Sequence, residues 1–259
     1  MNFIGIIPAR YASTRFPGKP LALIAGKPMI QRVYEQAQKA LDTVIVATDD
    51  ERIMNCVQRF GGNAVMTSPN HSCGTNRCYE AYIKSPHAGK TGKTVSDDVI
   101  INIQGDEPFI DPIQIKLLQS CFPTEIATLV TPFKPSDGTD ALFNPNSPKV
   151  VISGQTSKKA LLFSRSVIPY YRGVAQDKWL EEAERRGTPF YRHIGMYAYR
   201  ADILQQIVKL QPSVLEQTES LEQLRWLEAG YEIRVAITDK QTIGIDTPED
   251  IKKAEQQCC

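Results

Sequence analysis

The chain has 259 residues, 42% of them hydrophobic and 23% charged, and its formal net charge at pH 7 is +1. This composition is typical of a globular protein, and the length is near the upper limit for one hydrophobic core, so we expect a single domain over residues 1–259. The balanced charge gives no support for nucleic-acid binding. No apolar run is long enough to span a membrane and no signal-peptide pattern precedes the first strand, so we expect a cytoplasmic protein without membrane association.

The six cysteines form no C-x-x-C pair and lack the spacing to histidine that is typical of metal sites. In a cytoplasmic protein we expect reduced thiols. The sequence therefore predicts neither a zinc site nor a disulfide framework, and the pair Cys258–Cys259 is expected to belong to a frayed tail.

The first predicted element is an apolar strand at Phe3–Ile7, followed by a glycine-containing loop that carries Arg10, Arg15 and Lys19. No carboxylate precedes Glu35. Cations and backbone N–H groups just beyond the carboxyl end of a strand are suited to binding phosphates. The loop has neither the Walker nor the Rossmann glycine pattern. A solvated basic loop is the alternative, but the preceding strand and the missing acids favour phosphate binding.

Helical and strand patterns alternate up to about residue 131, as in an α/β protein. We expect strands at 43–48, 64–66, 99–103 and 127–131, and helices at 29–39, 51–60, 75–83 and 112–121. The pattern predicts a mostly parallel, Rossmann-like sheet.

Asp106 directly follows the predicted central strand, with Gln104 and Glu107 beside it. Open α/β sheets bind their ligands at the carboxyl ends of the strands. A carboxylate facing a cationic phosphate loop would repel a triphosphate unless a divalent cation lay between them, and Mg²⁺ is the usual cation in such sites. The alternative is that Asp106 caps the turn before the helix at Pro112.

Asp246 is the predicted partner of Asp106, because it lies at the start of the last predicted helix, which begins at Pro248. The alternative, that this segment only caps the helix, has strong support here, since an acidic or hydroxyl side chain followed by proline is also typical of a helix N-terminus. Asp246 or Thr247 would then be the N-cap.

From about residue 132 to 200 the sequence changes to short alternating strand patterns after a loop-rich stretch at 133–149. We expect an antiparallel insertion on the parallel sheet. Helices at 201–209 and 219–228, a strand at 232–237 and the final helix complete the prediction.

Arg165, His193 and Tyr197 lie in strand-like segments of this region, where alternation can place His193 and Tyr197 on one face. An arginine with neutral polar groups suits a small acidic, hydroxyl-rich molecule. A buried core histidine is the alternative for His193. Glu222 and Gln223 are, on pattern alone, ordinary surface polar residues of a helix.

Six motifs carry a resemblance that covers essentially the whole chain: IPARYASTRFPGKPL, NIQGDEP, FSRSVIPY, RHIGMYAYR, LEQLRWLEAG and GIDTPED. They resemble those of the 3-deoxy-D-manno-octulosonate (Kdo) cytidylyltransferases, or CMP-Kdo synthetases. The resemblance implies a nucleotidyltransferase that converts CTP and Kdo to CMP-Kdo and pyrophosphate with Mg²⁺, for lipopolysaccharide biosynthesis. The chain departs from the family pattern S-G-T-[DE]-R at residues 73–77, which read C-G-T-N-R.

The resemblance also implies roles for individual residues. Lys19 and Asp106 would be catalytic, and Asp106 and Asp246 would bind the metal. The nucleotide would be bound by Arg10, Ser13, Arg15, Lys19, Gly74, Arg77 and Gln104. The sugar would be bound by Gln104, Arg165, His193, Tyr197, Glu222 and Gln223.

The strand-rich, aromatic region at 132–200 is expected to contribute to the sugar site and to a homodimer, because exposed strand edges are usually paired or covered and the family forms dimers through this region. Two alternatives stay open. One is a cytidylyltransferase for another acidic sugar, such as 8-amino-Kdo or a sialic-acid-like sugar. The other is a non-catalytic nucleotide-binding sensor.

Overall fold

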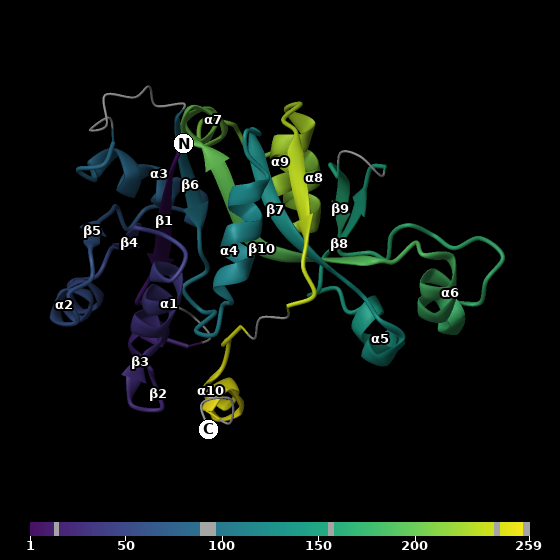
Figure 1. Ribbon diagram of the computed structural model, residues 1–259, viewed down its shortest axis with the longest axis horizontal. Helices are drawn as coiled ribbons and strands as arrows, with labels where there is room; N and C mark the ends of the chain where they lie inside the picture. The colour runs from purple at the N-terminus through teal and green to yellow at the C-terminus, as the bar shows by residue number, and fades with distance from the viewer. Residues whose placement is uncertain (13–15, 89–96, 155–157, 241–243, 256–259) are drawn as a thin grey trace. The chain divides into compact units, whose positions relative to one another are not determined.

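The computed structural model describes residues 1–12, 16–88, 97–154, 158–240 and 244–255 (Figure 1). The chain divides into two compact units. Unit 1 contains residues 1–119, 196–208 and 242–259, and unit 2 contains residues 120–195 and 209–241. The predictions for Ser13, Arg15 and the Cys258–Cys259 tail fall outside the described residues.

Unit 1 is built on a parallel sheet. Strand β1 (Asn2–Ala9) pairs in parallel with β4 (Thr43–Thr48) on one side and with β6 (Asp98–Asn102) on the other, and β4 pairs with β5 (Ala64–Met66). The second half of β10 (Tyr191–Arg200) adds an antiparallel strand at β6. The carboxyl ends of the four parallel strands therefore meet at one edge, the edge at which ligands bind in such sheets.

The helices of unit 1 begin and end largely where local signals predict. Helix α2 starts because the Asp50 side chain accepts a hydrogen bond from the Arg52 backbone N–H, and it is followed by Gly61 at a left-handed φ of 78°. The α-helices with residues in unit 1 are α1 (Met29–Gln38), α2 (Glu51–Arg59), α3 (Gly74–Lys84), α4 (Pro112–Ser120), α7 (Ala201–Ile207) and α10 (Pro248–Glu255). A short 3-10 helix η1 (Lys19–Leu21) precedes the small hairpin of β2 (Leu23–Ile24) and β3 (Lys27–Pro28).

Unit 2 combines parallel and antiparallel pairs. Strand β7 (Ile126–Pro132) runs parallel to β11 (Ile233–Ile237), and β8 (Lys149–Ile152) runs antiparallel to β9 (Ala160–Ser164). The first half of β10 pairs antiparallel with β8. The remaining elements are α5 (Gly138–Phe143), α6 (Trp179–Arg186), α8 (Val214–Glu219), α9 (Gln223–Glu228), η3 (Pro135–Asp137) and η4 (Gln176–Lys178). The predicted fold class, a mostly parallel sheet with an antiparallel middle segment, is confirmed.

Two predictions of secondary structure in this unit are wrong. The stretch predicted as loop-rich contains α5, and the helix predicted over 219–228 begins only at Gln223. Ser220 has a left-handed φ of 51°, which ends α8 and starts a new turn before α9. The apolar periodicity of 221–227 correctly indicates a helix, but it does not show that the backbone changes direction at Ser220.

Each unit has its own core. The central strands β1, β4 and β6 of unit 1 are buried along most of their length, as their continuous apolar runs predict. Unit 2 contains an aromatic cluster in which Trp179 stacks on Phe190 at a centroid distance of 5.9 Å and Tyr171 lies against both rings.

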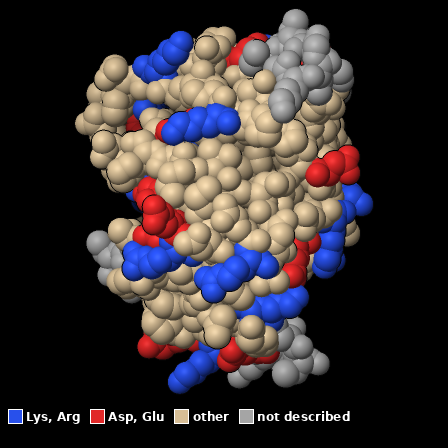
Figure 2. Space-filling view, turned by 90° about the vertical axis from the view of Figure 1, so that its left-hand side faces the viewer, with Lys and Arg blue, Asp and Glu red and all other residues tan. Residues whose placement is uncertain are grey.

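The charged surface is mixed in sign. On the face drawn in Figure 2, basic and acidic side chains are interspersed among other residues. Such a surface agrees with the formal net charge of +1. Within the described part of the chain, no helix has both the length and the apolar character needed to cross a bilayer.

Candidate functional site

Three backbone segments approach one another at the carboxyl edge of the unit 1 sheet. A Cβ on Gly105, after β6, would lie 2.8 Å from the carbonyl oxygen of Pro8 in β1. A Cβ on Gly74, at the start of α3, would lie 3.4 Å from the Pro8 ring. The first distance is too short for any side chain, so glycine at 105 is required for the loops after β1 and β6 to meet.

Lys19 is presented to this edge by a turn that depends on glycine. Gly18 has a φ of 70°, and its N–H donates to the carbonyl of Tyr11 at 2.9 Å. The η1 turn begins directly afterwards, so that the loop is closed just before Lys19.

The Lys19 ammonium lies between the two predicted metal-binding carboxylates. Lys19 Nζ is 2.7 Å from Asp106 Oδ2 and 3.5 Å from Asp246 Oδ1, and it also donates to the carbonyl of Ile245 at 2.8 Å. The Lys19 side chain is only 16% exposed, whereas those of Asp106 and Asp246 are 34% and 49% exposed. The backbone N–H of Ile245 donates to the carbonyl of Asp106 at 2.9 Å and so fixes the two segments together.

Other carboxylates contribute capping hydrogen bonds at the helices that follow Asp106 and Asp246. Asp111 Oδ1 accepts the backbone N–H of Ile113 at 2.9 Å and caps α4. At the start of α10, Asp250 Oδ2 accepts the backbone N–H groups of Asp246 and Thr247 at 3.2 and 3.0 Å. Asp111 and Asp250 thus contribute capping interactions at these helices, and the Asp106 and Asp246 carboxylates contact Lys19.

This donor set fits a magnesium ion. Two carboxylates and a backbone carbonyl oxygen converge on one positive charge, and oxygen donors are those that Mg²⁺ prefers. No group of three or more His, Cys, Asp or Glu residues able to hold a metal is present among the residues described. Mg²⁺ sites are commonly completed by water and substrate phosphates rather than by protein side chains alone.

The other predicted nucleotide residues of unit 1 occupy different environments. Arg10 follows β1, and its guanidinium donates to the backbone carbonyl of His71. Gln104 is half-buried and lies two residues after the end of β6. Gly74 is the first residue of α3, whose N-terminus lies against Pro8.

Arg77 is fully buried, and its guanidinium is hydrogen-bonded to other side chains of the protein. Its two terminal nitrogens donate to Thr67 Oγ1 at 2.6 Å and to Asp49 Oδ2 at 2.7 Å. Asp49 follows β4 and Thr67 follows β5, so Arg77 ties the ends of two neighbouring strands to α3. Arg77 therefore stabilises the backbone at the carboxyl edge of the sheet.

Arg165, one of the predicted sugar-binding residues, lies in unit 2 after β9. Its guanidinium donates to the carbonyls of Glu219, Ser220 and Pro145 at 2.5, 3.2 and 2.9 Å. The Glu219 carboxylate in turn accepts the backbone N–H of Arg165 at 2.8 Å and the hydroxyl of Ser164 at 2.6 Å. Arg165 therefore fixes the end of α8 as well as presenting a positive charge.

His193 and Tyr197 lie on β10, in unit 2 and unit 1 respectively. His193 Nε2 is 3.2 Å from Thr128 Oγ1, and its ring meets Phe163 edge-on at a centroid distance of 5.1 Å. Burial lowers the pKa of the His193 imidazole, so the ring is neutral at pH 7. Tyr197 is buried and stacks on Tyr199 at 5.9 Å.

Glu222 and Gln223 lie in unit 2, at the start of α9. Glu222 Oε1 accepts from Arg225 at 3.1 Å. Gln223 is only 4% exposed, and its side-chain Nε2 has no hydrogen-bond acceptor among the described residues. A buried amide of this kind can donate to a ligand that supplies the acceptor.

Comparison with known proteins decides the family. The family model for cytidylyltransferases matches residues 4–236. The chain belongs to the cytidylyltransferase family. The cytidylyltransferase is 59% identical over 258 residues to the 3-deoxy-manno-octulosonate cytidylyltransferase of Parabacteroides distasonis, with 98% of this chain and 97% of that protein covered. It is 57% identical to the protein of the same name from Phocaeicola vulgatus, with 98% and 96% covered. The resemblance drawn from the motifs is thereby confirmed.

Solved structures agree. The structure of CMP:2-keto-3-deoxy-manno-octonic acid synthetase complexed with CTP matches at a TM-score of 0.84 and 38% identity, with 100% of this chain and 98% of that chain covered. A glucose-1-phosphate thymidylyltransferase from Bacillus anthracis matches at a TM-score of 0.60 and 17% identity, with 98% and 94% covered. At 17% identity, the match to the thymidylyltransferase shows a similar fold and nothing further.

Sequence reasoning about the cytidylyltransferase missed several residues that support its site. No role in the site was predicted from the sequence for Asp49 or His71. Glu219 carries no local signal, because its carboxylate partners are 54 and 55 residues away in the sequence. Glu80 carries no local signal for its contacts with Ser68 and His71. Only the spacing of Glu80 and Lys84, four residues apart on one helix, indicates a pair.

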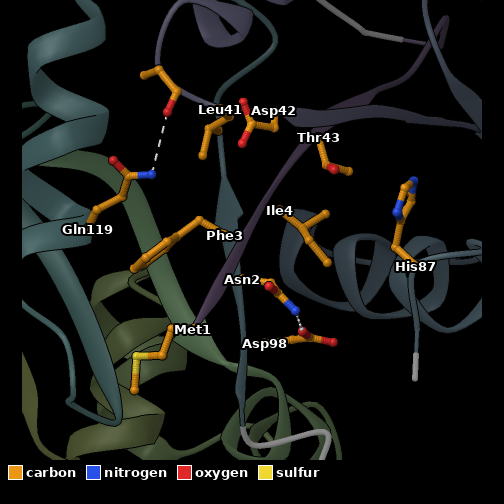
Figure 3. Close-up of a pocket in the computed structure, with 11 residues that line it drawn as sticks. Met1, Asn2, Phe3, Ile4, Leu41, Asp42, Thr43, His87, Asp98 and Gln119 are labelled. Atoms are coloured by element: carbon orange, nitrogen blue, oxygen red, sulfur yellow. Dashed lines mark hydrogen bonds between the residues drawn. The ribbon is translucent and has the colours of Figure 1, made fainter. Parts of the chain in front are cut away.

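The cytidylyltransferase also has a cavity of about 300 Å³ away from these residues. Asn2, Thr43 and Asp98, the first residues of β1, β4 and β6, line it (Figure 3). Asp98 is buried and accepts hydrogen bonds from Asn2 at 2.9 Å and Tyr82 at 2.7 Å. This cavity lies at the amino ends of the parallel strands and contains none of the predicted site residues.

Proposed function

We propose that this protein activates Kdo with CTP, giving CMP-Kdo and pyrophosphate for lipopolysaccharide biosynthesis. The observation that carries the proposal is the convergence of Lys19, Asp106 and Asp246 at the carboxyl edge of the sheet, in a chain 59% identical to a named Kdo cytidylyltransferase. Cations beside paired carboxylates suit a metal-bound triphosphate. We place the reaction in the cytoplasm.

The nucleotide is bound by unit 1 in this proposal. Arg10, Lys19 and the backbone N–H groups at the start of α3 provide positive charge for the phosphates. Gly74 and Gln104 lie beside them, and Arg77 supports the strand ends. Ser13 and Arg15 would complete the phosphate contacts.

Asp106 and Asp246 would hold Mg²⁺, which when bound neutralises charge on the phosphate oxygens. Lys19 acts on the leaving-group side. Its ammonium is held by Asp106, Asp246 and the Ile245 carbonyl, and it is at the end of a long side chain that can follow the charge developing on pyrophosphate.

The reaction is an in-line displacement. The anomeric oxygen of Kdo forms a bond to the α-phosphorus of CTP, the bond from that phosphorus to the bridging oxygen of pyrophosphate breaks, and the hydroxyl proton passes to solvent. No protein nucleophile is required. The protein orients the two substrates and stabilises the charge that develops on the phosphates.

In this proposal the residues that bind the sugar are Gln104, Arg165, His193, Tyr197, Glu222 and Gln223. Arg165 provides the cation for the Kdo carboxylate, while the neutral His193 ring, Tyr197, Glu222 and Gln223 contact the hydroxyls. We further propose a homodimer formed through the region 132–200, where β9 pairs only with β8 among the described strands and exposes Leu161 and Leu162.

Pyrophosphate release from CTP tests this function across a panel of acidic sugars: Kdo, 8-amino-Kdo and N-acetylneuraminic acid. Release with Kdo is expected. Release only with 8-amino-Kdo or the sialic acid would contradict the assignment of the sugar. CTP binding without release for any sugar would favour the nucleotide sensor.

A further inference from the structure

The Glu80 carboxylate of α3 ties Ser68 and His71, in the segment of residues 67–73 between β5 and α3, back to that helix. Arg77 of α3 contacts the same segment only at its first residue, Thr67, among the hydrogen bonds of the described residues. Glu80 Oε2 accepts the backbone N–H of Ser68 at 2.9 Å and contacts His71 Nε2. Its other oxygen, Oε1, pairs with Lys84 Nζ at 2.5 Å. Oε2 therefore contacts the segment, and Oε1 contacts Lys84, whose side chain is half exposed.

The same segment holds Arg10. The Arg10 guanidinium donates to the backbone carbonyl of His71, so the position of that carbonyl determines where the guanidinium lies. His71 is thereby fixed through its side chain to Glu80 and fixes Arg10 through its backbone. The connection runs from α3 to the loop after β1 by way of one residue.

We propose that Glu80 is a positioning residue for the triphosphate of CTP, acting through His71 on Arg10. This inference rests on the proposed function, in which Arg10 binds phosphate. A guanidinium held in advance by a fixed carbonyl loses less conformational freedom when it binds an anion. Without Glu80, the 67–73 segment loses two of its restraints and Arg10 has to be ordered by the ligand.

The Glu80 carboxylate is ionised under working conditions. Although burial raises its pKa, hydrogen bonds from Lys84, the Ser68 backbone and His71 lower the pKa to about 2. The groups that face it are Lys84, His71 and the Ser68 N–H. The restraint is therefore present throughout the pH range in which CTP is fully ionised.

The test is the dissociation constant for CTP, measured by calorimetry without Kdo, for Glu80→Ala and for Lys84→Ala. We expect Glu80→Ala to weaken CTP binding about tenfold, the size of one lost charge-assisted hydrogen bond. Lys84→Ala removes the partner on Oε1 and the hydrogen bond from Lys84 Nζ to the Met66 carbonyl at 3.2 Å, but it keeps both contacts of Oε2, and it is expected to change binding less than twofold. In steady-state assays the KM for CTP should rise in Glu80→Ala while the KM for Kdo stays unchanged.

A double-mutant cycle with Arg10→Ala separates positioning from a general structural role. If Glu80 acts through Arg10, adding Glu80→Ala to the Arg10→Ala variant does not raise the dissociation constant for CTP any further. Additive losses in the cycle, or unchanged CTP binding in Glu80→Ala, would overturn the inference. If Glu80→Ala fails to fold, as judged by its melting curve, His71→Ala takes its place in the same cycle and is read by the same two outcomes. Absence of CTP binding in the unsubstituted protein would instead contradict the proposed function.

Discussion

Lys19 Nζ lies 2.7 Å from Asp106 Oδ2, although the two residues are 87 positions apart in the chain. Asp246, a further 140 residues on, reaches the same ammonium at 3.5 Å. The three segments meet because β1 and β6 are neighbouring parallel strands and because the chain returns to unit 1 after residue 241. The Lys19 ammonium and these two carboxylates form the centre of the candidate site at the carboxyl edge of the sheet.

Asp106→Asn and Asp246→Asn should each reduce turnover by orders of magnitude while the protein remains folded. Both substitutions keep the shape of the side chain but remove a charge that would bind Mg²⁺. Pyrophosphate release and melting temperature are the measurements. Asp111→Ala is the matched control: it removes the α4 cap, should cost about 1 kcal/mol of stability and should leave turnover unchanged. An active Asp106→Asn protein at ordinary Mg²⁺ would show that Asp106 is no metal ligand.

Lys19→Met should increase the affinity of the protein for Mn²⁺ when no nucleotide is present. The Lys19 ammonium neutralises the same two carboxylates that would bind the metal, so the two cations compete for them. Mn²⁺ binding followed by electron paramagnetic resonance measures this without turnover. Lys27→Met, which removes an exposed partner of Glu35, should have no effect. Equal Mn²⁺ affinity in Lys19→Met and the unsubstituted protein would mean that the ammonium does not occupy the metal position.

Gly105→Ala should destabilise the protein by about 1–3 kcal/mol and lower its activity. The added methyl group would lie 2.8 Å from the Pro8 carbonyl oxygen, so the loops after β1 and β6 would have to separate. Denaturant unfolding measures the loss. Gly244→Ala, whose added Cβ meets nothing within 4 Å, should leave stability unchanged. Equal stability of the two variants would contradict the close approach.

The stability of the protein should fall as the pH decreases below about 6.5, in part through His193. Burial lowers the pKa of His193 in the folded state, so below the unfolded value of about 6.5 the unfolded chain binds the extra proton and is favoured. His193→Gln should reduce this slope between pH 6.5 and 4, measured as free energy of unfolding. A slope identical in both proteins would show that His193 is protonated equally in the folded and unfolded states.

Arg165→Ala and His193→Ala should raise the KM for Kdo and leave the KM for CTP nearly unchanged. Loss of a hydrogen bond to a charged group costs about 1.5–3 kcal/mol, or about ten- to a hundredfold in affinity. Titration of both substrates against each variant measures the split. Because Arg165 also donates to the backbone carbonyls of Pro145, Glu219 and Ser220, its variant should melt at a lower temperature. An equal loss of CTP affinity would contradict the assignment of these residues to the sugar.

Elements whose signals are local could be predicted from the sequence. Strand β4 at Thr43–Thr48 was predicted residue for residue, because a buried parallel strand is a continuous β-branched run. The convergence of Lys19 and Asp106 was predicted because both follow neighbouring strands. The break at Ser220 could not be predicted, since a serine gives no signal for a left-handed backbone. The link from Glu80 through His71 to Arg10 was also missed, because it includes a backbone carbonyl whose direction only the folded chain determines.

The most direct measurement of the central claim is ³¹P nuclear magnetic resonance of the protein with CTP, Kdo and Mg²⁺. The account predicts that pyrophosphate and a new phosphodiester signal from CMP-Kdo appear in equal amounts, and that neither appears with Asp106→Asn. CTP signals that persist unchanged with the unsubstituted protein, or pyrophosphate that accumulates with CMP but without the phosphodiester, would contradict it.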